Sequence, residues 1–255
     1  MPMNRAQFLK SLTCFGVAVT LLSCQDHLTT PTGPQRFRLK RIINSDGQAG
    51  SGTLPTTTTL NYNSVGKLSD YTVVTGSTQD YRITLQYNSQ GRLVGREGRD
   101  RTGNLINSAT FESDASGNIT TIKTYLNPDQ NGNVSLNLTT QIEYNAEQLP
   151  GKVTLSGDGR PTSTITHTYN NGNIVSALIE TPSVNYTETY SYDDKPNPFY
   201  GLIGFDTSIH DIINRNNRIR VSQFLTYEYN GNGLLTRVVL NRGAIPTTTY
   251  EYEPY

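Results

Sequence analysis

The sequence predicts an all-β fold: a large antiparallel meander of repeated β-hairpins, strongly twisted or curled into a half-barrel or two layers, with one short helix near residues 208–214. Composition is the first indication, since 34% of the residues are hydrophobic and 16% charged. Thr, Asn, Ser and Gly are abundant, and they suit strands with one wet face joined by many turns better than they suit helices. The other two indications are an internal repeat and regular alternation of the 16 tyrosines with polar residues, which argue against disorder.

The N-terminus is predicted to be a signal peptide over residues 1–23. Arg5 and Lys10 precede a 12-residue apolar run at residues 11–22, which is shorter than the roughly 20 residues that a transmembrane helix needs. The run ends in Leu-Leu-Ser-Cys, which resembles a bacterial lipobox and implies cleavage before Cys24 and acylation of Cys24. The lipid would then attach the protein to a membrane. The alternative is an ordinary signal peptide followed by an incidental cysteine.

The remaining chain has no cysteine other than Cys24, because Cys14 lies in the segment to be removed. We therefore expect no disulfide and no thiolate chemistry. Removing Arg5 and Lys10 from the 21 basic residues leaves 19, against 21 acidic ones. This near balance gives no field for nucleic acid, so none is predicted as a partner. Residues 24–35 are predicted to be the acylated Cys and a flexible tether, and residues 36–255 a single domain.

Internal repetition is the strongest feature of that domain. In "LQYNSQGRLVGR", a Tyr is followed by Asn88, two loop residues, Gly91, a polar residue and Leu93. The Asn side chain can bond to the backbone two residues on, and Gly91 then takes the positive φ that closes a bulged hairpin. Asn171-Gly172 is one residue shorter and predicts a two-residue turn with positive φ at both positions. Equivalent glycines are Gly66, Gly117 and Gly233, and weaker copies occupy residues 141–153, 189–202 and 249–255.

Two segments frame or interrupt the repeats. Residues 36–42, "RFRLKRI", are predicted to be the opening strand, and their bases either bind an acidic partner or, as we favour, protect an exposed sheet edge from aggregation. The interval from Tyr192 to the next repeat is long, and it contains isoleucines at helical spacing after Asp206 or Thr207 as an N-cap. We expect the helix there to pack on the sheet or to plug an open end.

The repeat resembles the tyrosine–aspartate (YD, Rhs-type) repeat, whose core is Tyr-Asp-x-x-Gly-Arg-Leu. "YNSQGRL" at residues 87–93 matches it except that Asn88 replaces the Asp. Together with the lipobox and "YDDKPNPF", the chain resembles uncharacterised YD-repeat-like lipoproteins of Bacteroidota over most of residues 55–255. The resemblance implies an architecture rather than an activity. The Asn in place of Asp preserves the turn and gives no support to an acidic function.

Candidate catalytic and metal-binding groups are few. The three histidines have no ligand spacing, and no nucleophile or phosphate-loop motif occurs. Asp193 and Asp194 are adjacent, so on a strand they point to opposite faces and suit turn capping better than acid/base chemistry. Residues 127–138 imitate a calcium loop, but the twelfth position is Leu138 instead of the bidentate Glu, and a plain hairpin loop is favoured. We predict no metal and no cofactor.

These observations favour a non-enzymatic binding or scaffold module for a protein or glycan partner, anchored by lipid in the cell envelope at the outer membrane, on either face. The tyrosines could stack on sugars, although cross-strand packing is the favoured interpretation. Two alternatives remain open: a purely structural spacer, and a hydrolase-type enzyme with a site in the 193–215 insert, using Asp194, Asp206, His210 and Asp211. Candidate partner-binding residues lie where the repeat pattern fails, at Asp193, Asp194, Asn197, Phe199, Tyr200 and His210.

Overall fold

The computed structural model describes residues 36–45, 54–126, 135–157, 159–205, 209–219, 225–240 and 247–255. The expected signal peptide, Cys24 and the tether lie outside these ranges. So do Asp206, Thr207 and most of the calcium-like segment, residues 127–134.

Within the described residues, one antiparallel sheet of fifteen strands forms most of the molecule. Its spatial order is β12 through β1 without a break, followed by β17, β16 and β15. A second sheet contains only β13 and β14, and α2 is a single short helix. The strands are β1 Phe37–Ser45, β2 Thr56–Tyr62, β3 Leu68–Thr75, β4 Thr78–Tyr87, β5 Leu93–Asp100, β6 Leu105–Ser113, β7 Ile119–Leu126, β8 Ser135–Tyr144, β9 Pro150–Gly157, β10 Arg160–Asn170, β11 Asn173–Glu180, β12 Asn185–Thr189, β13 Ser191–Pro196, β14 Asn216–Ile219, β15 Leu225–Tyr229, β16 Leu235–Leu240 and β17 Thr247–Pro254, and α2 is Ile209–Ile213.

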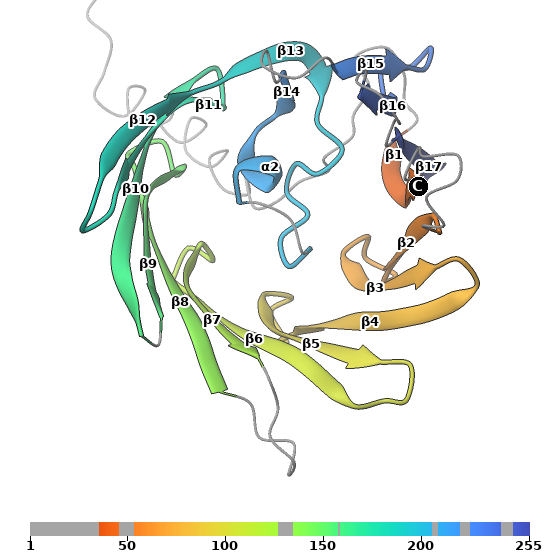
Figure 1. Ribbon diagram of the computed structural model, residues 1–255, viewed down its shortest axis with the longest axis horizontal. Helices are drawn as coiled ribbons and strands as arrows, with labels where there is room; N and C mark the ends of the chain where they lie inside the picture. The colour runs from red at the N-terminus through yellow and green to blue at the C-terminus, as the bar shows by residue number, and fades with distance from the viewer. Residues whose placement is uncertain are drawn as a thin grey trace, which may run out of the picture.

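The large sheet curls until its two edges, β12 and β15, face each other across the small sheet (Figure 1). The predicted curled meander is confirmed, as a single curled layer that is not closed into a barrel. The curvature has a repeated cause. In each hairpin with an Asn or Asp turn, one residue of the outgoing strand has no partner opposite, as with Ser69 between the pairs Tyr62–Leu68 and Asn61–Asp70. Such bulges bend the strand and increase its twist. The same bulge recurs at Val94, Thr120, Gly151, Val175 and Thr236.

The turns at one rim of the sheet have the predicted chemistry. The Asn88 side-chain oxygen accepts hydrogen bonds from the backbone N–H groups of Gln90 and Arg92, at 3.0 and 2.9 Å. Gly91 has φ 73°, a left-handed conformation that favours glycine. Asn171 and Gly172 have φ 50° and 77°, as expected for the two-residue turn.

Tyrosine hydroxyls connect most of the hairpins to their neighbours, although Ser113 occupies the tyrosine position in the hairpin that turns at Asp114. Tyr87, which precedes the Asn of one turn, donates a 2.7 Å hydrogen bond to the carbonyl of Leu68, the residue that opens the outgoing strand of the previous hairpin. Tyr192 makes the same kind of contact in another hairpin, to the carbonyl of Ile174. Burial raises the pKa of Tyr192 to about 12, so its hydroxyl remains protonated and can donate at neutral pH. The repeated Tyr and Leu are therefore parts of one inter-hairpin contact. The same contact joins Tyr62 to Leu39, Tyr144 to Ile119, Tyr169 to Pro150, Tyr192 to Ile174 and Tyr252 to Leu235.

The opening strand β1 is not a sheet edge, contrary to the expectation from its bases. It pairs with β2 on one side and with the C-terminal strand β17 on the other. Ion pairs stabilise the pairing of β1 with β17: Arg38 lies 2.7 Å from Glu253, and Arg41 lies 3.1 Å from Glu251. β17 and β1 together form a hairpin without a turn, and Lys40 occupies the usual bulge position. The partial repeat at residues 249–255 is thus completed by the other end of the domain.

The predicted helix is confirmed at Ile209–Ile213. It lies inside the curled sheet together with the loop that precedes it (Figure 1). Residues 197–205 and 209–214 are called the plug below. Leu202 of the plug is buried in the core formed by the inner face of the sheet, and Phe199, Ile203 and Phe205 pack against that core. Gly204 has φ 89°, and a Cβ there would lie 2.7 Å from Leu85, so glycine is needed for this close approach.

Candidate functional site

Buried asparagines fix the plug to the sheet. Asn214, which is 2% exposed, accepts a 2.7 Å hydrogen bond from the N–H of Ile174 at the start of β11. Just after the plug, Asn216 of β14 exchanges two hydrogen bonds with Asn173 of β11, of 2.9 and 3.0 Å. Within the plug, Asn197 donates to the carbonyl of Asn214 at 2.8 Å. Buried amides bonded on several sides hold a backbone in one position, so the plug is a fixed part of the interior.

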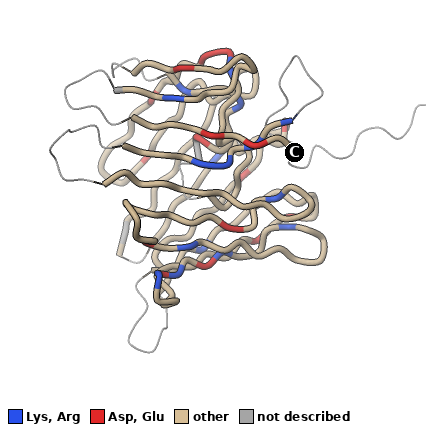
Figure 2. The backbone as a smooth tube through the Cα atoms, turned by 90° about the vertical axis from the view of Figure 1, so that its right-hand side faces the viewer, with Lys and Arg blue, Asp and Glu red and all other residues tan. Residues whose placement is uncertain are grey.

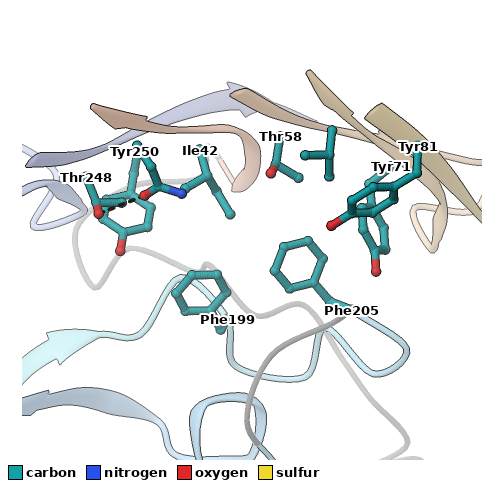
Figure 3. Close-up of a pocket in the computed structure, with 10 residues that line it drawn as sticks. Ile42, Thr58, Tyr71, Tyr81, Phe199, Phe205, Thr248 and Tyr250 are labelled. Carbon is teal, nitrogen blue, oxygen red and sulfur yellow. Dashed lines mark hydrogen bonds between the residues drawn. The ribbon is translucent and has the colours of Figure 1, made fainter. Parts of the chain in front are cut away.

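A cavity of about 260 Å³ lies between the plug and the inner face of the sheet. Its sheet wall comes from β1, β2, β3, β4 and β17, toward the ends of these strands that lie away from the asparagine turns. Its opposite wall comes from Phe199 and Phe205 of the plug (Figure 3). The lining residues are Ile42, Asn44, Thr58, Tyr71, Val73, Tyr81, Phe199, Phe205, Thr248 and Tyr250.

Aromatic rings form a continuous group along the plug side of the cavity. The ring centres of Phe199 and Phe205 are 5.8 Å apart and nearly parallel, with 20° between their planes. Tyr250 meets Phe199 edge-on at 5.9 Å, and Tyr71 meets Phe205 at 4.8 Å. These distances and angles are the favourable ones for aromatic pairs, so the rings hold one another in place.

Polar groups lie on the sheet side of the cavity, near its mouth. Thr248 donates a 2.9 Å hydrogen bond to the side-chain oxygen of Asn44 across the β1–β17 pair, as the dashed line in Figure 3 shows. The Thr58 hydroxyl is on the same wall (Figure 3). Burial raises the pKa of Tyr250, so its hydroxyl is neutral at physiological pH. None of the ten lining residues carries a charge there.

The predicted partner-binding residues are placed in several different environments. Phe199 lines the cavity. Asp193 holds the seam between the sheet edges, because its carboxylate accepts hydrogen bonds from the Tyr229 hydroxyl and the Asn217 amide. Asp194 is 84% exposed and pairs with Lys195 at 3.1 Å.

The other predicted positions belong to the plug. Asn197 bonds to its backbone, and Tyr200 donates its backbone N–H to the Asn197 carbonyl at 3.2 Å. His210 lies in α2. Asp206 lies outside the described residues and the His210 side chain is not described, so the structure does not place the set proposed for the hydrolase-type site as a whole. Asp211, from that second set, lies 3.7 Å from Arg218.

His167 is buried in β10, where its Nδ1 lies 2.9 Å from the Pro150 carbonyl and its ring meets Tyr169 edge-on. Burial lowers its pKa, although the Pro150 carbonyl opposes that shift, so the neutral form is favoured. Among the described residues, no three His, Cys, Asp or Glu side chains form a group able to hold a metal ion. In the same part of the chain, no helix has the length and apolar character needed to cross a membrane.

Of the cavity residues, only Phe199 is among the site residues predicted from the sequence. Tyr71 and Tyr250 lie in segments that the repeat predicts as strands, and neither Thr58 nor Tyr81 is a predicted site residue. Tyr71 and Tyr81 fall outside the Tyr-Asn positions of the repeat, and that departure was the available signal. Tyr250 and Ile42 are more than 200 residues apart in sequence and directly opposite in the β1–β17 pair. No local pattern could bring them together.

Comparison with known proteins gives a structural likeness only. No family model matches the chain, and no curated protein matches it. Among the solved structures that match is the crystal structure of a porin-like protein from Bacteroides uniformis, with a TM-score of 0.52 and 19% sequence identity. The match covers 88% of this chain and 100% of that one. At this identity the likeness concerns the fold: this protein is similar to the porin-like protein in its large antiparallel sheet.

Proposed function

We propose that the protein is an envelope-anchored lipoprotein of the YD-repeat-like type that acts as a non-enzymatic binding module for a protein or glycan partner. The observation that carries the proposal is the cavity between the plug and the strands β1–β4 and β17. A concave site that combines aromatic rings with polar side chains is able to orient a ligand. The asparagine contacts of the plug support a preformed site, because they fix the wall that carries Phe199 and Phe205.

Attachment to the membrane through Cys24 forms part of the proposal. Ion pairs connect neighbouring strands on the outer face of the sheet, such as Arg82–Asp70 at 3.0 Å and Lys123–Glu112 at 2.8 Å. Figure 2 shows charged residues of both signs distributed along the strands. Charged side chains are costly in hydrocarbon. A lipid on Cys24 is therefore a better candidate for the membrane contact than the charged outer face of the sheet. The fold shared with a porin-like protein agrees with an envelope location.

The proposal is tested in intact cells with a photo-crosslinking residue at Asn44, at the cavity mouth. We expect a specific adduct from Asn44. The same residue introduced at Val94, which is 38% exposed at a bulge on β5, is the matched control and should give no such adduct. Cys24→Ala should move the protein out of the membrane fraction. Turnover of polysaccharide, peptide or ester substrates by the purified protein would contradict the non-enzymatic function.

A further inference from the structure

The cavity is small and its described lining residues are uncharged, and these two properties restrict its ligand. Its volume of about 260 Å³ lies below the range of about 300–1,000 Å³ that is typical of pockets for drug-sized molecules. One ring with its substituents is therefore the right size. A ligand with a phosphate, carboxylate or ammonium group would have to bury that charge without a counter-charge among the lining residues, which is unfavourable.

The distribution of polar and apolar groups restricts the ligand further. The plug side offers ring surfaces from Phe199 and Phe205, where an apolar face can be buried. The sheet side offers the Asn44 amide and the hydroxyls of Thr58 and Thr248, which can donate and accept hydrogen bonds. In Figure 3 the hydroxyl of Tyr81, which belongs to β4 in the sheet wall, points toward the space beside Phe205. A suitable ligand is thus neutral, with one apolar face and an edge rich in hydroxyl groups.

A neutral pyranose sugar has both features, since its C–H groups lie on its two faces and its hydroxyls project from the edge. We infer that the cavity binds a single neutral pyranose residue, as a free sugar or as the end of a glycan. The ring packs against Phe199 and Phe205, and its hydroxyls bond to Asn44 and Tyr81. This inference rests on the proposed function and names the ligand class of the same site. A segment of a protein partner is the alternative ligand of this cavity.

The test uses the full chain purified from membranes in detergent and saturation-transfer NMR with methyl glycosides of glucose, galactose and mannose. We expect saturable binding to at least one of them. Glucuronic acid and glucosamine should bind at least tenfold more weakly, because none of the described lining residues offers them a counter-charge. Tyr81→Ala and Asn44→Ala should each weaken binding of the same glycoside by about tenfold or more.

Tyr186→Ala is the matched control, because Tyr186 is 45% exposed on the edge strand β12, away from the cavity. It should leave binding unchanged. The inference is overturned if no neutral glycoside binds, if the two cavity variants bind as well as the wild type, or if charged sugars bind equally. A peptide crosslinked at Asn44 without any sugar binding would overturn the inference and leave the proposed binding function intact. Substrate turnover would overturn both.

Discussion

At the residue scale, a complete copy of the repeat, such as the one at residues 87–93, contributes three separate contacts. The Asn closes its own turn, the Gly takes the left-handed conformation, and the Tyr bonds to the previous hairpin. The basic residue after the Gly reaches the next turn: Lys67 donates to the Gly91 carbonyl at 2.6 Å, and Arg92 donates to the Asp114 carbonyl at 2.9 Å. The motif therefore specifies both a hairpin and the way that hairpins join.

Replacing Tyr87 tests the contact between hairpins. Tyr87→Phe removes the donor to the Leu68 carbonyl and retains the ring. Because a typical hydrogen bond contributes about 1 kcal/mol, we expect the free energy of unfolding to fall by about that amount. Urea denaturation measures it. Tyr186→Phe, at an exposed tyrosine, is the control, and an equal loss in both variants would show that the contact is not specific.

Two glycines in one turn test the conformational requirement. Gly233 has φ 75°, whereas Gly231 lies outside the left-handed region and a Cβ there would meet open space. Gly233→Ala should lower the free energy of unfolding by about 1–2 kcal/mol, since an L-residue is strained in that conformation. Gly231→Ala should change it by less than about 1 kcal/mol. Thermal or urea unfolding of the pair measures the difference, and similar values for both would contradict the explanation.

At the scale of elements, the sequence predicted the strands and turns well and the plug only in outline. The repeats located the hairpins because Asn, Gly and the alternation act within a few residues. The long interval after Tyr192 interrupts the pattern and predicts a helix near residues 208–214, and the structure places α2 at Ile209–Ile213. Its position inside the sheet depends on contacts such as Asn214 with Ile174, 40 residues apart. Such contacts leave no local pattern, so the cavity between plug and sheet could not be predicted.

Asn214 is the position at which loosening of the plug is best tested. Asn214→Ala removes the acceptor for the N–H of Ile174. A buried donor without a partner costs about 1–3 kcal/mol, and we expect a loss of that size together with faster proteolysis of the plug. Limited proteolysis and urea denaturation measure both effects. Asn232→Ala, at an exposed turn position, should leave both unchanged, and equal proteolysis of the two variants would contradict the assigned role.

At the scale of the whole molecule, the N-terminal and C-terminal strands complete each other. The Tyr62 hydroxyl bonds to Leu39 of β1 just as Tyr87 bonds to Leu68 of β3, so β1 takes the place of an ordinary outgoing strand. The complementary charges of Arg38 and Arg41 with Glu251 and Glu253 were visible in the sequence. They were interpreted as edge protection because nothing local connects residues 210 or more apart.

A circular permutant tests this arrangement. Joining residue 255 to residue 36 through a short Asn-Gly turn and opening the chain between Arg101 and Thr102, in an exposed turn, should preserve the fold and at least the wild-type stability. The linker supplies only the turn that the pair lacks. Circular dichroism and urea denaturation measure the outcome. Truncation after residue 246, which removes β17, should instead unfold the domain, and a stable truncated protein would contradict the pairing.

The β1–β17 pair also has a consequence for the order of folding. Most other neighbouring strands of the sheet adjoin in sequence, so their hairpins can form early at little entropic cost, whereas β1 must meet a strand at the other end of the chain. During synthesis, β1 has no partner on that side until β17 has been made. We therefore expect a fast phase in which hairpins form one after another, followed by a single slow phase in which β17 pairs with β1.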